Sequence, residues 1–253
     1  GDLHSGRYGG AVRNALHEMA MLIASLHDSE GRVTVSGFDT DMEQPSARQR
    51  ADTAAFPFDE AAFLQEVGAT GAGDPAIAMR ERITLRPCLD VNGMWGGYTG
   101  AGSKTIIPSE AHAKISIRVA AGQDPKRVAD AVVAHLEAHC PEGVSLSFDR
   151  VGAGSPASTL APDHPLVQAA ETVLLRESGK QPIHVRLGAS VPITSIFKEM
   201  MGMDTLMFGF NLPDEPVHAP NEFFRLESVP MGLRAWPQIL RELAAFEPGA
   251  FRS

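Results

Sequence analysis

Cysteine is scarce in this sequence of 253 residues, which contains only Cys88 and Cys140. Two cysteines do not make the disulfide framework that stabilises many small secreted domains. Long apolar runs are missing as well, because none approaches the roughly 18 residues that a membrane-spanning helix requires. No signal-like segment opens the chain. We therefore expect a cytoplasmic protein that has no membrane partner.

Basic residues are outnumbered, with 22 Lys and Arg against 31 Asp and Glu, which gives a formal net charge of −9. No basic cluster stands out, so the charge pattern argues against nucleic acid as a partner. Hydrophobic residues make up 43% of the chain. A chain of this length and composition buries a sizeable core and forms one large or two modest domains.

The first part of the chain combines two helical patterns with strand-like ones. Apolar residues at three- and four-residue steps predict a helix over residues 11–27, and Asp124-Pro125 is a typical helix start. Apolar and polar residues alternate over 111–119, which predicts a strand with Arg118 on its polar face. The remaining expected features are strands at 32–36, 85–91 and 144–148, a short helix at 58–67 and a polar surface excursion at 39–55.

The order of these elements is helix, strand, strand, helix, strand. One additional strand before Gly1 would complete the split β-α-β arrangement of a ferredoxin-like domain, with two helices on an antiparallel sheet. The inner stripe of the second helix is expected to consist of Val128, Val132 and Leu136.

A stretch rich in Gly, Ser, Ala and Pro at 152–162 reads as a linker. Beyond it, the sequence predicts helices at 164–178, 191–202 and 224–246, and strands at 183–185 and 205–210. Alternating strands and helices favour a parallel α/β sheet, but so few strands cannot complete one. We expect an α+β protein, in which residues 1–161 form the ferredoxin-like domain and residues 162–253 form part of a larger α/β domain.

Six motifs then occur in the order seen in M20-family metallopeptidases, and the dipeptidase branch that includes carnosinases is the most similar. They are Asp2-Leu3-His4-Ser5-Gly6, Leu89-Asp90-Val91-Asn92-Gly93 with Trp95-Gly96-Gly97, Lys104-Thr105-Ile106-Ile107-Pro108, Ile115-Ser116-Ile117-Arg118, Arg186 to Pro192, and His218-Ala219-Pro220-Asn221-Glu222. This resemblance implies a catalytic domain with two zinc or manganese ions, interrupted by a lid domain that forms a homodimer. Residues 1–161 resemble the lid, and residues 162–253 resemble the C-terminal part of the catalytic domain.

The resemblance also implies roles for individual residues. His4 corresponds to the lid histidine that supplies an oxyanion donor to the neighbouring subunit, and Thr105 and Arg118 correspond to the lid's contributions to the partner's site. Arg186 corresponds to the residue that anchors the substrate carboxylate, with Ser190 beside it. An arginine suits that task because its planar guanidinium binds a carboxylate through two hydrogen bonds.

His218 corresponds to the last metal ligand of the family. The other ligands, namely the His-x-Asp motif, the bridging Asp and the Glu-Glu pair, lie before the lid in that family, and nothing here matches them. Because the chain also opens on Gly1 without a Met, we expect an upstream part to be missing and this chain to be inactive alone.

The sequence departs from the family at two places. Arg186-Leu187-Gly188-Ala189-Ser190 replaces the usual Arg-Glu-Gly-Gly-Ser, and Gly152-Ala153-Gly154 replaces a frequent His-Gly-Gly. Both departures lie near the expected substrate pocket, so they leave the identity of the substrate open.

Simpler readings exist for each residue. His218 alone could be an ordinary loop histidine, His4 could satisfy backbone groups at a helix entry, Arg118 could be a solvent-facing strand residue, and Thr105 could simply favour a strand. Two other functions also remain open. One is a noncatalytic dimerisation module, and the other is an M20-like aminoacylase or deacetylase that acts on N-acyl amino acids.

Overall fold

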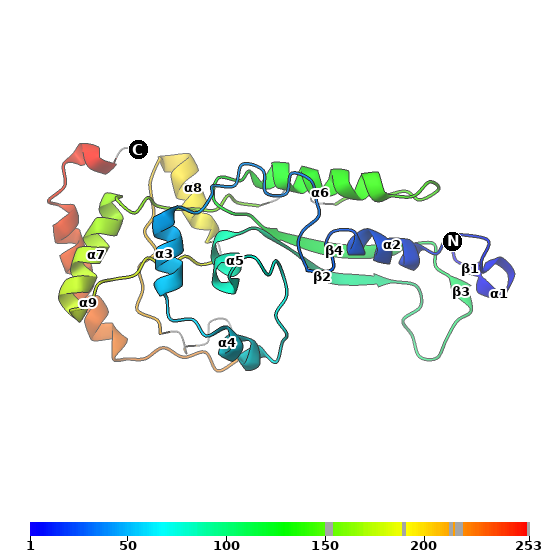
Figure 1. Ribbon diagram of the computed structural model, residues 1–253, viewed down its shortest axis with the longest axis horizontal. Helices are drawn as coiled ribbons and strands as arrows, with labels where there is room; N and C mark the ends of the chain where they lie inside the picture. The colour runs from blue at the N-terminus through cyan, green and yellow to red at the C-terminus, as the bar shows by residue number, and fades with distance from the viewer. Residues whose placement is uncertain (150–153, 189–190, 213–214, 216–219, 252–253) are drawn as a thin grey trace. The chain divides into compact units, whose positions relative to one another are not determined.

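The computed structural model describes residues 1–149, 154–188, 191–212, 215 and 220–251. The chain forms two compact units (Figure 1). Unit 1 comprises Gly1–Ala157 together with Arg186–Ser190, and unit 2 comprises Ser158–Val185 together with Val191–Ser253. The first boundary between the units falls within the predicted linker.

An antiparallel pair of long strands forms the centre of unit 1. Strand β2 (Cys88–Gly96) pairs with β4 (Ala111–Arg118), and a bulge interrupts the register between Val91 and Gly93 (Figure 1). The strand predicted at 111–119 is thus confirmed. The strand predicted at 85–91 begins later, because Leu85 is the last residue of a helix, and it extends to Gly96.

Two helices, α2 (Ala15–Ala24) and α6 (Pro125–His139), share one hydrophobic core with this sheet. Asn14 caps α2 by accepting a hydrogen bond from the backbone N–H of Leu16 at 2.9 Å, so the helix begins four residues later than predicted. Helix α6 begins at Asp124 and Pro125 as expected. The core consists of Leu22, Leu26, Val35, Phe38, Leu89, Val128, Val132 and Leu136, which confirms the predicted inner stripe of α6.

A second, shorter antiparallel pair lies at the N-terminus of unit 1. Strand β1 (Leu3–His4) pairs with β3 (Ile106–Ile107), and the short helix α1 (Ser5–Tyr8) follows β1 directly. The carboxylate of Asp2 accepts hydrogen bonds from the backbone N–H and the hydroxyl of Ser109, at 3.0 and 3.2 Å. These contacts hold the first residues of the chain against the segment between β3 and β4.

Three further helices lie between Phe38 and β2. Helix α4 (Glu60–Val67) confirms the helix predicted at 58–67, with Asp59 as its cap. Helices α3 (Ala47–Ala55) and α5 (Met79–Leu85) were not predicted. No residue of α3 is buried, and α5 buries only Met79. Neither helix therefore has the apolar stripe by which a helix is recognised in a sequence.

Four of the strands predicted from the sequence are wrong. Residues 32–36, 144–148, 183–185 and 205–210 are not strands, apart from one isolated bridge between His27 and Val33. Some of their apolar side chains are nevertheless packed, because Val33, Leu146 and Phe148 contact the core of unit 1, and Phe208 and Phe210 contact the core of unit 2. By contrast, Ile183 and Val185 are exposed. A strand also requires a neighbour that completes its hydrogen bonds, and these segments lack one.

These corrections affect the predicted fold class in two ways. The mixture of helices and antiparallel strands fits the α+β class, but a parallel sheet is not present in the described part of residues 162–253. Unit 1 has two helices that pack on an antiparallel pair, whereas its described residues do not form the outer strands of a ferredoxin-like sheet. The complete ferredoxin-like arrangement therefore stays a prediction.

Unit 2 is helical, and its three predicted helices are confirmed. Helix α7 (Pro165–Ser178) packs against α9 (Ser228–Leu243) around Val173, Ala235 and Ile239. Helix α8 (Pro192–Met201) and the short 3₁₀ helix η1 (Pro248–Phe251) complete the unit. Among the residues that the structure describes, no helix is both long and apolar enough to cross a membrane.

Candidate functional site

His4 is held in a defined orientation at the junction of β1 and α1. Its Nδ1 accepts a hydrogen bond from the backbone N–H of Gly6 at 3.0 Å, and this bond caps α1. Because an N–H donates to Nδ1, that nitrogen carries a lone pair, and the proton of the neutral ring resides on Nε2. The exposed imidazole therefore presents Nε2–H as a hydrogen-bond donor. A donor is what stabilisation of an oxyanion requires.

The absence of a side chain at Gly6 makes this arrangement possible. A Cβ atom at this position would lie 2.9 Å from Cε1 of His4 and 3.2 Å from its Nδ1. The first of these distances is closer than real Cβ contacts, so any side chain at position 6 would displace the imidazole ring.

Thr105 lies beside His4, although the two are far apart in the sequence. The carbonyl of Thr105 accepts a hydrogen bond from the backbone N–H of Ser5 at 2.9 Å, and His4 is paired with Ile106 in the β1–β3 ladder. The structure thus brings together two residues to which the resemblance assigns a role in the same site.

Arg118 lies at the far end of β4 from this pair. It is exposed and is the cross-strand partner of Cys88. Strand β4 begins at Ala111, close to β3, and its eight residues end at Arg118. At about 3.3 Å per residue, the strand spans roughly 23 Å. Within one chain, Arg118 therefore does not join His4 and Thr105.

The thiol beside Arg118 is not activated. Partial burial, the charge of Asp90 and a hydrogen bond to that carboxylate raise the pKa of Cys88 above its ordinary value. The thiol is therefore protonated at neutral pH, and it lacks the thiolate character that nucleophilic cysteines need.

Arg186 is half-buried and belongs to unit 1. Burial lowers its pKa, while the charge of Glu43 acts in the opposite direction. The side chain remains a cation at neutral pH, because an arginine in a protein does not lose its proton. Nearby, a Cβ atom at Gly188 would lie 2.2 Å from the carbonyl oxygen of Ile83 in α5. The backbone therefore approaches α5 so closely that only glycine fits at position 188.

Two residues of the predicted site, Ser190 and His218, lie outside the described residues, and so do Gly152 and Ala153. Within the described ranges, no group of three or more His, Cys, Asp or Glu side chains could hold a metal ion. The described residues therefore do not fit a centre of two metal ions.

Glu215 is a buried residue that the sequence interpretation overlooked. Its side chain has 0% exposure, and both carboxylate oxygens accept hydrogen bonds. Burial raises its pKa, but the backbone N–H groups of Arg225 and Leu212 and the guanidinium of Arg225 together lower it, so the pKa lies below its ordinary value. An acid between two prolines in a turn-rich stretch is typical of a solvated loop, and no sequence signal distinguishes it from a buried one.

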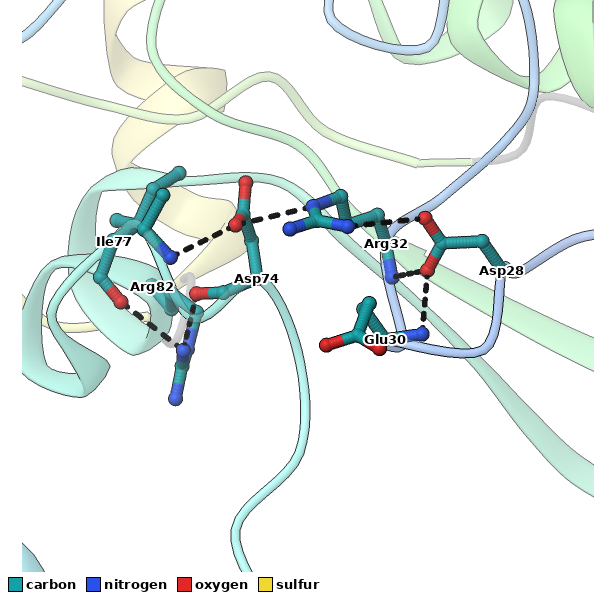
Figure 2. Close-up of polar contacts among 7 residues, drawn as sticks. Asp28, Glu30, Arg32, Asp74, Ile77 and Arg82 are labelled. Carbon is teal, nitrogen blue, oxygen red and sulfur yellow. Dashed lines mark hydrogen bonds and ion pairs between the residues drawn. The ribbon is translucent and has the colours of Figure 1, made fainter.

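A second polar cluster, on the surface of unit 1, has a structural role. Figure 2 shows Arg32 between Asp28 and Asp74, with its Nη1 3.4 Å from the first carboxylate and its Nε 3.1 Å from the second. Arg82 donates from Nη1 to the carbonyl oxygens of Asp74 and Ile77. This network ties the turn after α2 to the loop that leads into α5.

A protein-family model matches the first part of this chain. Residues 1–144 match the M20 peptidase dimerisation domain, and this range is more than half of the chain. The chain belongs to the M20 peptidase family. This finding confirms the resemblance that the sequence motifs indicated, including its dipeptidase branch, because M20 relatives of that branch match nearly the whole chain.

Among the curated M20 relatives is the Cys-Gly metallodipeptidase dug1 of Schizosaccharomyces pombe, which is 25% identical over 252 residues, covering 98% of this chain and 52% of the relative. The Beta-Ala-His dipeptidase of Rattus norvegicus is 24% identical over 258 residues, covering 98% of this chain and 51% of the relative. The crystal structure of the M20 family metallo-carboxypeptidase Sso-CP2 from Sulfolobus solfataricus shares the fold, with a TM-score of 0.81 at 24% identity, covering 97% of this chain and 56% of that one. The chain spans about half the length of the curated relatives that it matches.

Proposed function

We propose that this chain provides the lid, residues 1–161, and the C-terminal part of the catalytic domain, residues 162–253, of an M20 enzyme that hydrolyses dipeptides or short peptides. The observation that carries the proposal is the proximity of His4 and Thr105 in a chain of this family, since His4 pairs with Ile106 in the β1–β3 ladder and the carbonyl of Thr105 accepts from the backbone N–H of Ser5. There the imidazole presents a fixed N–H donor, which suits the stabilisation of an oxyanion at the scissile carbonyl.

We infer the substrate class from the positive charge of two arginines of this chain and from the names of the relatives. Those relatives are named for the dipeptides Cys-Gly and β-Ala-His. A dipeptide has a free carboxylate, and we assign its recognition to Arg186 and Arg118, with Ser190 beside the first. An arginine holds a carboxylate through two parallel hydrogen bonds, which fixes the orientation of the substrate as well as its charge.

The enzyme is proposed to act as a homodimer. His4 is exposed on unit 1, and Arg118 lies at the other end of β4, so one chain does not present all three lid residues to one site. Pairing of two lids would allow His4 and Thr105 to serve the site of the neighbouring subunit.

Hydrolysis in this family is expected to use two divalent ions, zinc or manganese, which activate water and polarise the carbonyl. His218 is the ligand that we assign to this chain. Since the described residues do not fit such a centre, we propose that the chain does not hydrolyse peptides by itself.

The surface of unit 2 supports the proposal that it packs against further parts of a catalytic domain. Helices α8 and α9 expose many large apolar side chains, while the core of the unit contains only a few buried ones. Apolar surface on this scale is usually covered by a protein partner. The exposed residues of the two helices are Ile193, Ile196, Met200, Met201, Val229, Met231, Leu233, Trp236 and Leu240.

Three measurements on the purified chain test the proposal. Sedimentation should show a dimer, calorimetric titration should show no binding of two zinc ions at micromolar concentration, and Cys-Gly and β-Ala-His should not be hydrolysed. Turnover of either dipeptide by the pure chain would overturn the proposed inactivity. A monomer at high concentration would overturn the proposed homodimer.

The protein expressed from the complete coding sequence of the gene tests the activity itself. It should hydrolyse dipeptides, and His4→Ala should lower kcat by about 10²–10³-fold, as expected for loss of an oxyanion donor. N-acyl amino acids should be tested as substrates alongside the dipeptides, because the Arg186 segment departs from the family pattern. Turnover of these compounds alone would identify an aminoacylase or deacetylase, and turnover of nothing would favour a noncatalytic dimerisation module.

A further inference from the structure

The loop between β2 and β3, residues 97–105, leads the chain to Thr105, which lies beside His4 (Figure 1). Every residue of this loop is exposed, so packing on a core does not hold its shape. Gly97 and Gly102 have left-handed backbones, with φ of 64° and 79°, and the chain therefore changes direction at both points. A loop of this kind keeps one conformation only if its own side chains hold it.

Tyr98 contacts both the middle and the end of the loop. Its hydroxyl donates a hydrogen bond to the carbonyl of Ala101 at 2.8 Å. The ammonium of Lys104 lies over its ring, 4.6 Å from the centroid. This contact is favourable because the face of an aromatic ring attracts a cation. One side chain thus connects three points of the loop, and the last of them is the residue directly before Thr105.

Gly100 allows the ring of Tyr98 to lie against the backbone of the loop. A Cβ atom at position 100 would lie 2.5 Å from Oη of Tyr98, 2.7 Å from its Cζ and 2.9 Å from its Cε2. Real Cβ atoms do not come so close to other atoms, so any side chain at position 100 would displace the ring.

The end of the loop is joined to the start of the chain. The carbonyl of Thr105 accepts a hydrogen bond from the backbone N–H of Ser5 at 2.9 Å, and the next residue, Ile106, is paired with His4. The place of Thr105 therefore depends on the β1–β3 ladder that follows it and on the loop that precedes it. Each strand of that ladder has only two residues, and so short a pair of strands is weak by itself.

We propose that Tyr98 is a positioning residue, whose ring and hydroxyl close the loop before Thr105 and thereby hold Thr105 against Ser5, beside His4. The purpose of this contact rests on the proposed function, in which Thr105 contributes to the substrate site of the neighbouring subunit. The loop itself consists entirely of described residues, and its closure is independent of any substrate.

Three variants separate the contacts of Tyr98. Tyr98→Ala removes the ring and the hydroxyl together, whereas Tyr98→Phe keeps the ring under Lys104 and loses only the hydrogen bond to Ala101. Gly100→Ala retains Tyr98 but displaces its ring. Gly93→Ala is the matched control, because a Cβ atom at Gly93, in β2, would meet nothing within 4 Å.

Amide hydrogen exchange, measured by NMR on the 253-residue chain, tests the positioning directly. Exchange of the Ser5 amide should rise about tenfold in Tyr98→Ala and in Gly100→Ala, because the carbonyl that accepts its hydrogen bond is no longer held in place. Tyr98→Phe should raise it less, and Gly93→Ala should leave it unchanged. Wild-type exchange in both Tyr98→Ala and Gly100→Ala would overturn the proposal and leave the proposed function untouched.

Kinetics of the protein expressed from the complete coding sequence of the gene test the purpose of the contact. With Cys-Gly as substrate, Tyr98→Ala should raise KM about fivefold at nearly constant kcat, because a displaced binding residue weakens the substrate and the transition state alike. A merely structural role would reduce the amount of folded enzyme, and therefore the apparent kcat, at an unchanged KM. Tyr98→Phe should restore most of the wild-type KM.

A double-mutant cycle shows whether Tyr98 acts through Thr105. In a Thr105→Ala background, Tyr98→Ala should cause no further rise in KM, because the residue that it positions has already lost its side chain. The same rise in both backgrounds would overturn the positioning role. A wild-type protein that hydrolyses no dipeptide would instead overturn the proposed function, while the exchange result would still decide whether Tyr98 holds the loop.

Discussion

The backbone N–H of Gly6 donates a hydrogen bond to Nδ1 of His4 at 3.0 Å, and this contact decides which ring nitrogen of His4 faces solvent as a donor. The contact joins His4, which caps the four-residue helix α1, to Gly6 within that helix. It shows how a short glycine-containing motif can fix a tautomer, because the backbone donor occupies the only other nitrogen of the ring.

Replacing Gly6 with Ala should displace the His4 ring while leaving the protein folded. The new Cβ would lie 2.9 Å from the ring, and the imidazole can rotate away because it is the end of an exposed side chain. We expect the Nδ1 acceptor to be lost and stability to change by less than about 1 kcal/mol. Nitrogen-15 NMR of the imidazole would report a mixture of tautomers in place of a single Nε2–H form.

Gly93→Ala is the matched control for that experiment. A Cβ atom at Gly93 would meet nothing within 4 Å, and its φ is not in the left-handed region. The His4 signals of this variant should equal those of the wild type. A wild-type spectrum without a preference for the Nε2–H form would contradict the proposed orientation.

Gln123→Ala should destabilise unit 1 by about 2–4 kcal/mol, because buried hydrogen-bonding groups lose their partners. The side chain of Gln123 is 2% exposed, accepts from the N–H of Ala120 at 2.8 Å and donates to the carbonyl of Phe38 at 2.7 Å. Urea denaturation followed by circular dichroism measures the effect. Gln65→Ala, at an exposed position of α4, should change stability by less than about 0.5 kcal/mol.

His135 should make stability depend on pH near neutrality. Its Nε2–H donates to the carbonyl and the hydroxyl of Ser25, and its ring stacks on His139 with centroids 4.0 Å apart. Burial, and then the charge of His139, lower the pKa of His135 below its ordinary value of 6.5. The unfolded chain therefore binds a proton more readily than the folded one, and stability should fall as the pH decreases below about 6.5.

Thermal denaturation at a series of pH values between 8 and 5 measures this dependence. His135→Gln should show a smaller loss of stability over that interval than the wild type. His17→Gln, at an exposed position of α2, should retain the wild-type dependence. Identical curves for His135→Gln and the wild type would show that His135 is not the group responsible.

The cluster of Figure 2 should contribute to stability that is lost in acid. Hydrogen bonds from the backbone N–H of Arg32 and of Ala76 are the main causes that lower the pKa of Asp28 and Asp74, respectively, below 3.8. A lowered pKa means that the carboxylates stabilise the fold above about pH 3.8 and that this contribution disappears as the pH falls through the folded values.

Asp74→Asn should therefore weaken the acid dependence of unfolding, and its effect should be largest above pH 4. The contribution is small, since solvent screens exposed ion pairs. Asp149→Asn, at an exposed position, serves as the control. A larger effect for Asp149→Asn than for Asp74→Asn would contradict the proposed role of the cluster.

The helices were predictable where the sequence combined a cap, a proline and an apolar stripe. Asp124 and Pro125 start α6, and Val128, Val132 and Leu136 are buried as their spacing indicated. Helix α3 lacks buried residues, and its start depends on a capping box at Ser46 and Gln49 that was not recognised. The strand predictions were wrong for another reason. The alternation of apolar and polar residues at 144–148 reflects packing of side chains on the core, without a partner strand.

The geometry of the candidate site was not predictable from the sequence. The motifs assign roles to His4 and Thr105, and these roles stay predictions, while the family comparison confirms the family. The pairing of β1 with β3 brings these two residues together, while the length of β4 separates Arg118 from them. Glu215 could not be found from the sequence, because its importance comes entirely from its burial and from donors at Leu212 and Arg225.

The sequence by itself determined the family, the positions of the capped helices and the apolar residues of the core, because these depend on local spacing and residue chemistry. The tertiary structure decided which distant segments meet and which carboxylate is buried. Those properties depend on contacts between residues far apart in the chain, and local patterns carry no information about such contacts.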